Sequence, residues 1–199
     1  MLSSGLWHWL PAITVTICWA LFALVWLAGA IYNARRAPAV RERSSAAAQW
    51  LIGAVIFLVL DRITPTRIWR PLMVDARWLV VLGLAVLVVS TAFTLWARAE
   101  LGTMWSSTAV VKDDHVLRTD GPYAITRHPI YTGLLGMLAG TGLIDGLGRW
   151  VVFFGIAVLI AGLKIRAEER LLDRTLGGAY DQYRQRVPLL VPGPRSVRK

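Results

Sequence analysis

The first 33 residues of the chain contain no charged side chain, and this run limits the folds that the sequence can adopt. The stretch from Ala12 to Ile31 is apolar and has the roughly 20 residues that a helix needs to cross a bilayer. Trp7 and Trp9 precede it, and tryptophan commonly anchors a helix at the membrane interface. We therefore expect an integral membrane protein.

Further apolar runs predict an all-α polytopic membrane protein with about five transmembrane helices. The second run, 46–60, is short, and the third, Trp78–Ala97, is long enough to span. Ile130–Ile144 and Trp150–Leu163 are separated by a glycine-rich turn and predict a tight helical hairpin. The last helix is expected to continue to Leu176, because no proline or glycine interrupts it. A GxxxG spacing in the fourth run favours close helix packing.

Composition supports one membrane domain over residues 1–199, with three helices in 1–97 and a more polar half in 98–199. Hydrophobic residues make up 56% of the chain, above the range of soluble domains. The single cysteine, Cys18, excludes an internal disulfide and a cysteine-based zinc site.

The basic residues lie between the apolar runs, which favours an anionic membrane surface over nucleic acid as partner. Seventeen of the 22 lysines and arginines fall in 33–45, 98–128 and the stretch after Leu163. The positive-inside rule places these segments in the cytoplasm, with the N-terminus outside and the C-terminus cytoplasmic. The excess of arginine over lysine is common in GC-rich bacteria and favours a bacterial inner membrane.

The stretch Gly121–Gly133, GPYAITRHPIYTG, is a polar hinge between two apolar regions. Two prolines in it prevent a continuous helix. We expect a polar ligand site at the membrane face, and the alternative is an amphipathic connector with interfacial aromatic residues. The donors that the hinge would offer are Tyr123, Arg127, His128 and Tyr131.

A second polar group, KIRAEERLL, follows the last apolar run. Lys164 and Glu168 are four residues apart and share a helix face, while Arg166 and Glu169 lie on a neighbouring face. Surface ion pairs on a solvated helix end are the alternative, and each would stabilise the helix little. Ionisable residues so close to an apolar span are, however, usually functional.

Other kinds of site have weaker support. His115 and His128 could bind a metal ion, but neither HExxH nor CxxC occurs, and we expect no metal site. A triad of Ser106, His128 and Asp120 would lack a nucleophile elbow. The fourth apolar run contains the first two glycines of a GxGxxG motif, but an aspartate stands at the position of the third glycine. The sequence around it also does not predict a Rossmann fold.

Together these motifs resemble the isoprenylcysteine carboxyl methyltransferase family and its bacterial relatives. GPYAITRHPIYTG is followed about 35 residues later by EERLL and then by LGGAYDQYRQRVP. The preceding LGTMWS and DDHVLRTDGPY fit the bacterial members, and phospholipid methyltransferases are more distantly similar. The resemblance covers roughly Leu101–Pro192, and LGGAY departs from the acidic stretch that is usual in the family.

The resemblance implies a methyltransferase core in 98–199 that binds S-adenosylmethionine at the cytoplasmic side and receives a lipid-like acceptor from the bilayer. In this family the acceptor would meet a basic residue that corresponds to Lys164 or Arg166. The residues implied to line the cofactor pocket are His115, Val116, Leu117, Arg118, Tyr123, His128, Pro129, Ile130, Tyr131 and Glu168.

The chemistry of the methyl donor is consistent with these side chains. Arg118, Arg127 or backbone N–H groups can pair with its carboxylate, and Glu168 can hold its ammonium or a ribose hydroxyl. Tyr123 and Tyr131 can contact the sulfonium cation or stack on the adenine.

The acceptor decides which residues would be catalytic. A carboxylate needs no general base, so catalysis would be positioning and exclusion of water, with Arg166 or Lys164 orienting the acceptor. An amine or a hydroxyl needs a base, and Glu169 and His128 are the candidates. A lipophilic acid, thiol or amine and a lipid head group all remain open as acceptors.

Two other functions compete with this interpretation. A membrane reductase of the steroid or sterol type would use NADPH on a similar C-terminal membrane fold. A non-catalytic membrane partner protein would leave the hinge and the Lys164–Glu169 cluster unexplained. Binding of S-adenosylhomocysteine, of NADPH or of neither distinguishes the three.

Overall fold

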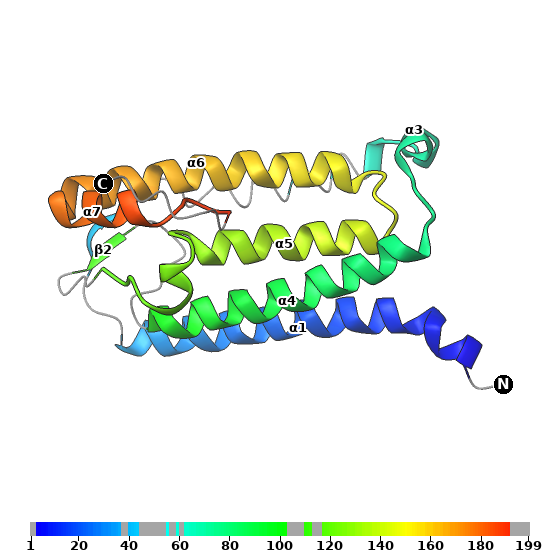
Figure 1. Ribbon diagram of the computed structural model, residues 1–199, viewed down its shortest axis with the longest axis horizontal. Coiled ribbons are helices and arrows are strands. Elements are labelled where there is room, and N and C mark those ends of the chain that lie inside the picture. The colour runs from blue at the N-terminus through cyan, green and yellow to red at the C-terminus, as the bar shows by residue number, and fades with distance from the viewer. Residues whose placement is uncertain are drawn as a thin grey trace.

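The computed structural model of the protein describes residues 3–36, 40–43, 55, 59, 62–102, 110–112 and 117–191. It is a bundle of long helices, as Figure 1 shows. The four main helices are α1 (Ser3–Arg36), α4 (Arg77–Leu101), α5 (Pro129–Ile144) and α6 (Trp150–Leu176). The helix expected at 46–60 lies almost entirely outside the described residues.

Three of these helices, α1, α4 and α6, are long and apolar enough to cross a membrane. The fourth, α5, is also apolar but has only 16 residues. Many of the large apolar side chains on the outside of the bundle are exposed, among them Leu24, Val89 and Leu159. Such an apolar exterior suits a helical protein surrounded by lipid.

The predicted hairpin is confirmed. α5 ends at Ile144 and α6 begins at Trp150, so that residues 145–149 form the turn. α6 continues to Leu176 as expected, and Gly177 ends it with a φ of 52°, a conformation that glycine adopts without strain. α1 and α4 are both longer than the apolar runs that predicted them. The residues that flank each apolar run are also helical.

Shorter elements connect the long helices. α3 (Thr66–Trp69) and η2 (Arg70–Leu72) precede α4, and η4 (Gly121–Ala124) lies within the hinge. α7 (Gly178–Arg186) follows α6, and residues 187–191 belong to no helix or strand, as expected of the tail.

The structure also contains a strand pair that the all-α expectation did not include. β1 (Val40–Arg43) pairs antiparallel with β2 (Val110–Lys112). The two strands come from the two polar segments 33–45 and 98–128. Strands of three and four residues are too short for a periodic pattern, so the sequence carried no signal for them.

α4 and α5 pack closely because glycines line their interface. A Cβ on Gly140 would lie 2.7 Å from the backbone nitrogen of Leu87, and one on Gly83 would lie 2.7 Å from the carbonyl oxygen of Gly140. Gly136 similarly faces Ser90. The interpretation of the GxxxG spacing as close helix packing is therefore confirmed.

A small core forms where α1, α4 and α5 meet. Cys18, Leu87 and Met137 are buried there against one another. The indole nitrogen of Trp19 donates a hydrogen bond of 3.1 Å to the hydroxyl of Thr141, which ties α1 to α5.

The polar segments of the chain share one end of the bundle. Figure 1 shows the C-terminal ends of α1, α4 and α6 at the same end as α7, β2 and the start of α5. The N-terminus and α3 lie at the other end. The segments that the charge distribution assigned to a single membrane side thus lie together.

Candidate functional site

The hinge places two charged side chains immediately before α5. Pro122 is the second residue of the turn η4, and Pro129 begins α5 at the position where its missing N–H costs no helical hydrogen bond. Arg127 and His128 lie between these two helical elements, and the imidazole of His128 is buried.

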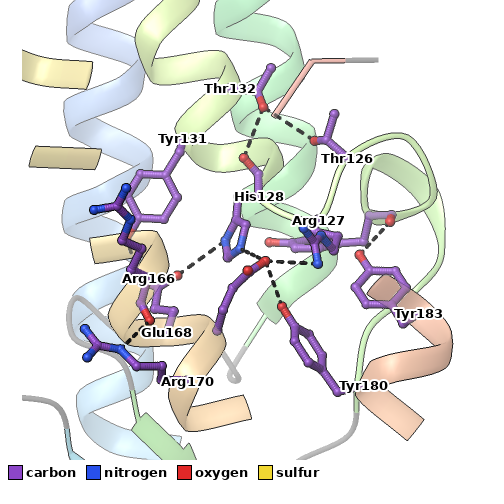
Figure 2. A network of polar contacts seen from close by, with 12 residues as sticks. Thr126, Arg127, His128, Tyr131, Thr132, Arg166, Glu168, Arg170, Tyr180 and Tyr183 are labelled. Atoms are coloured by element: carbon purple, nitrogen blue, oxygen red, sulfur yellow. Dashed lines mark hydrogen bonds and ion pairs between the residues drawn. The ribbon is translucent and has the colours of Figure 1, made fainter. Parts of the chain in front are cut away.

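The hinge meets the end of α6 through a cluster of charged groups, which Figure 2 shows. The ring of His128 lies between two carboxylates, with Nδ1 3.5 Å from Oε2 of Glu168 and Nε2 3.3 Å from Oε1 of Glu169. The hydroxyl of Tyr131 donates to Oε1 of Glu168 at 2.6 Å. One guanidinium nitrogen of Arg127 lies 3.2 Å from Oε1 of Glu169. The two motifs that suggested function are therefore in direct contact.

Two tyrosines of α7 join this cluster. The hydroxyl of Tyr180 donates to Oε1 of Glu169 at 3.1 Å, and that of Tyr183 donates to the carbonyl oxygen of Tyr123 at 2.7 Å. Both rings are buried. Sequence reasoning quoted these tyrosines as part of a motif but gave them no role, although their spacing of three residues places them on one helix face.

The chain after α7 also holds the hinge. The carbonyl oxygen of Pro188 accepts from the backbone N–H of Arg127 at 2.9 Å, and that of Leu189 accepts from the N–H of His128 at 3.2 Å. The hydroxyl of Thr132 donates to the carbonyl oxygen of Leu190 at 2.7 Å. These contacts were not predicted, because backbone acceptors have no sequence signature.

Burial and charge act in opposite directions on the pKa of His128. Burial by itself lowers the pKa of this imidazole, but hydrogen bonds to Glu168 and Glu169 and the charges of both carboxylates outweigh it. The pKa of His128 therefore lies above its ordinary value, because the two carboxylates favour the charged form of the ring. Burial raises the pKa of the Tyr123, Tyr180 and Tyr183 phenols, which stay protonated as donors.

The basic candidates for the acceptor site differ in burial. Lys164 is 2% exposed, whereas Arg166, two residues later on α6, is exposed. Before the hinge, Arg118 is exposed and Leu117 is half-buried. Within the hinge, Tyr123 is buried.

Three predicted residues, His115, Val116 and Ser106, lie outside the described part of the chain. Pro129 is buried and Ile130 half-buried at the start of α5. Among the residues that the structure does describe, no group of three or more histidine, cysteine or acidic side chains is arranged to hold a metal ion.

Comparisons with known proteins point to one family. The model of the isoprenylcysteine carboxyl methyltransferase family matches residues 81–174. A protein-S-isoprenylcysteine O-methyltransferase of Schizosaccharomyces pombe is 36% identical over 80 residues, which are 40% of this chain and 34% of that protein. A methanethiol S-methyltransferase 2 of Bradyrhizobium diazoefficiens is 30% identical over 154 residues, 71% of this chain and 57% of that protein.

A solved structure agrees in fold. The eukaryotic intramembrane Ras methyltransferase ICMT superimposes with a TM-score of 0.54 at 27% identity, over 72% of this chain and 52% of that chain. The chain thus spans about a third of the length of the yeast relative and just over half of the other two proteins. All of these matches are to methyltransferases, and they give the reductase alternative no support. The region that matches the isoprenylcysteine carboxyl methyltransferase family, residues 81–174, contains the hinge and the paired glutamates, and the chain is similar to this family in sequence and in fold.

Proposed function

We propose that the protein is an integral membrane methyltransferase that transfers a methyl group from S-adenosylmethionine to a lipophilic acceptor. The family supports the reaction class. The observation that carries the proposal is the contact of His128 with both Glu168 and Glu169, which unites the hinge and α6 in one polar site. That site lies at one end of a bundle of apolar helices, where a polar cofactor and a lipid-like acceptor can meet.

The side chains at the site fit the charges of S-adenosylmethionine. Glu168 is 27% exposed and carries one hydrogen bond from Tyr131, so it can also hold an ammonium group or a ribose hydroxyl. Arg118 is exposed just before the hinge and can pair with a carboxylate. Tyr123 and Tyr131 supply aromatic rings for the sulfonium or the adenine.

The bound donor would supply an electrophilic methyl group, and the chain would supply position and a dry site. Holding donor and acceptor in line can contribute about 7–11 kcal/mol to lowering the barrier. We assign orientation of the acceptor to Arg166, because it is exposed on α6 whereas Lys164 is buried.

The charge state of the site favours an acceptor that needs no general base. His128 faces a carboxylate with each ring nitrogen, and Glu169 accepts from Tyr180 and is paired with Arg127, so neither is well placed to take a proton. A carboxylate or an ionised thiol can attack without such a base. The names of the relatives include an O-methyltransferase and an S-methyltransferase, which is consistent with both acceptor types.

We further propose that the chain crosses the membrane about five times, with the site in the cytoplasm and the N-terminus outside. The shared end of the polar segments and the bias of lysine and arginine toward them support this topology. The arginine-rich composition supports a bacterial inner membrane.

A methyl-transfer assay tests this proposal. Detergent-purified protein is incubated with S-adenosylmethionine labelled with tritium in the methyl group and with three lipophilic acceptors of matched chain, an acid, a thiol and an amine. We expect label in the acid or the thiol and little in the amine. Label in the amine alone would contradict the acceptor assignment, and NADPH-dependent reduction of a sterol by the same protein would contradict the reaction class.

A further inference from the structure

The two carboxylates at the end of α6 have different environments, although they are neighbours in the sequence. Oε1 of Glu169 accepts a hydrogen bond of 3.1 Å from Tyr180, lies 3.3 Å from Nε2 of His128 and forms an ion pair of 3.2 Å with the guanidinium of Arg127. A carboxylate oxygen has two lone pairs, so His128 and Tyr180 together can occupy this oxygen fully. Glu168 forms an ion pair with His128 and accepts a hydrogen bond from Tyr131, and it also interacts electrostatically with Lys164.

These contacts form a continuous chain of polar groups from α7 to the cofactor site. The hydroxyl of Tyr180 donates to Glu169, Glu169 faces Nε2 of His128, and Nδ1 of His128 faces Glu168. Tyr180 is 1% exposed and therefore fixed in position by the packing of α7. The ring of His128 lies between the two carboxylates, and Figure 2 shows this ring with Glu168 and Tyr180 close by.

We infer that Tyr180 and Glu169 are positioning residues that act on the cofactor through His128 and Glu168. This inference rests on the proposed function and divides the glutamate pair into two roles. Glu168 contacts the cofactor, and Glu169 keeps His128 charged and oriented so that it in turn orients Glu168. Glu169 is then not the general base that the sequence alone allowed.

The charged and titratable groups that face His128 come from three elements and the hinge. α6 contributes both glutamates, α5 contributes the ring of Tyr131 at 5.9 Å between centroids, and the hinge and α7 act on Glu169 through Arg127 and Tyr180. Replacing Glu169 by glutamine removes one of the two negative charges beside the imidazolium. His128 should then lose its proton at a lower pH.

The chain offers a matched control on the same helix. Tyr183 is also a buried tyrosine of α7, but its hydroxyl donates to a backbone carbonyl of the hinge and not to Glu169. Tyr180→Phe and Tyr183→Phe each remove one hydroxyl from α7. Only Tyr180→Phe interrupts the series of polar contacts that leads from α7 to Glu168.

The first measurement follows the His128 ring in ligand-free protein by nitrogen NMR after labelling with ¹⁵N-histidine. The chain has three histidines, and loss of a signal in His128→Gln assigns the ring. We expect Tyr180→Phe to shift the Nε2 signal and Glu169→Gln to lower the pH at which the ring titrates. Tyr183→Phe should leave both at the wild-type values.

The second measurement titrates the same variants with S-adenosylhomocysteine over a range of pH. We expect Tyr180→Phe to weaken binding about threefold to tenfold, the effect of one lost hydrogen bond. The variant with both Tyr180→Phe and Glu169→Gln should bind no more weakly than Glu169→Gln alone, because Tyr180 acts through Glu169.

The outcomes separate the inference from the proposed function. Unchanged ring signals and unchanged affinity in Tyr180→Phe, with tight binding by the wild type, would overturn the inference alone. Equal effects of Tyr180→Phe and Tyr183→Phe on the His128 ring would overturn it as well, by showing a general effect of α7 docking. A third outcome is that the variants change the His128 ring signals as expected while the wild type binds no S-adenosylhomocysteine. That outcome would uphold the coupling to His128 and refute the proposed function.

Discussion

The hydroxyl of Tyr131 donates a hydrogen bond of 2.6 Å to Glu168, which lies 37 residues later in the chain. Tyr131 belongs to the first turn of α5 and Glu168 to the last third of α6, so this bond closes the hairpin at its polar end. The short distance is typical of a bond to a charged acceptor. The bond holds in place the Glu168 carboxylate, which we propose contacts the cofactor.

Glu168→Gln should weaken the binding of S-adenosylhomocysteine by about tenfold or more, because a hydrogen bond to a charged group contributes about 1.5–3 kcal/mol. Glutamine keeps the shape of the side chain, so the protein should still fold and insert. Asp173→Asn makes the same change at an exposed position of the same helix and should bind like the wild type. Titration calorimetry measures both, and equal affinities in the two variants would refute the assignment.

Thermal stability should depend on pH through His128. The folded-state pKa of this imidazole is raised by the two carboxylates, so its stabilising effect is complete below the ordinary value of 6.5 and is lost as pH rises through the raised pKa. The difference in melting temperature between wild type and His128→Gln should therefore be larger at about pH 6 than at about pH 9. A difference that stays constant or grows with pH would show that the ring is neutral in the folded protein.

Two alanine substitutions at helical glycines should have different effects on stability. A Cβ on Gly140 would meet the backbone of α4, so Gly140→Ala should destabilise the protein by about 1–3 kcal/mol. Among the described residues, and apart from the nearby backbone of α6 itself, no atom lies within 4 Å of a Cβ on Gly155, so Gly155→Ala should be neutral or stabilise by up to about 1 kcal/mol. Thermal unfolding in detergent compares them, and equal melting temperatures would mean that α4 and α5 are not closely packed.

The chain after α7 should be needed for the site. Ending the chain after Val187 removes the carbonyl groups that accept from Arg127, His128 and Thr132. We expect lower thermal stability and loss of S-adenosylhomocysteine binding. Ending it after Val191 keeps all three acceptors and should preserve binding. If the two truncated proteins bind equally well, residues 188–190 have no part in holding the hinge.

The sequence predicted the elements of this site better than the contacts among them. The polar hinge, the hairpin and the continuation of α6 to Leu176 all follow from local patterns of proline, glycine and apolar residues. The contact of His128 with both glutamates could be expected only from resemblance to a family, since the residues are about 40 positions apart.

The remaining contacts have no local signal. The carbonyl groups of Pro188 and Leu189 would accept a hydrogen bond whatever their side chains, so nothing in the sequence marks them. Tyr180 and Tyr183 could be placed on one helix face, but their partners lie in distant segments. The strand pair β1–β2 similarly depends on where the chain returns after α4.

The central claim is that the hinge and the end of α6 bind the methyl donor, and calorimetric titration of detergent-purified protein tests it most directly. S-adenosylhomocysteine is titrated into wild type and Glu168→Gln, with NADPH in a parallel experiment. We predict micromolar binding of S-adenosylhomocysteine that Glu168→Gln weakens by about tenfold or more, and no binding of NADPH. Binding of NADPH alone, or of neither compound by folded protein, would contradict the account.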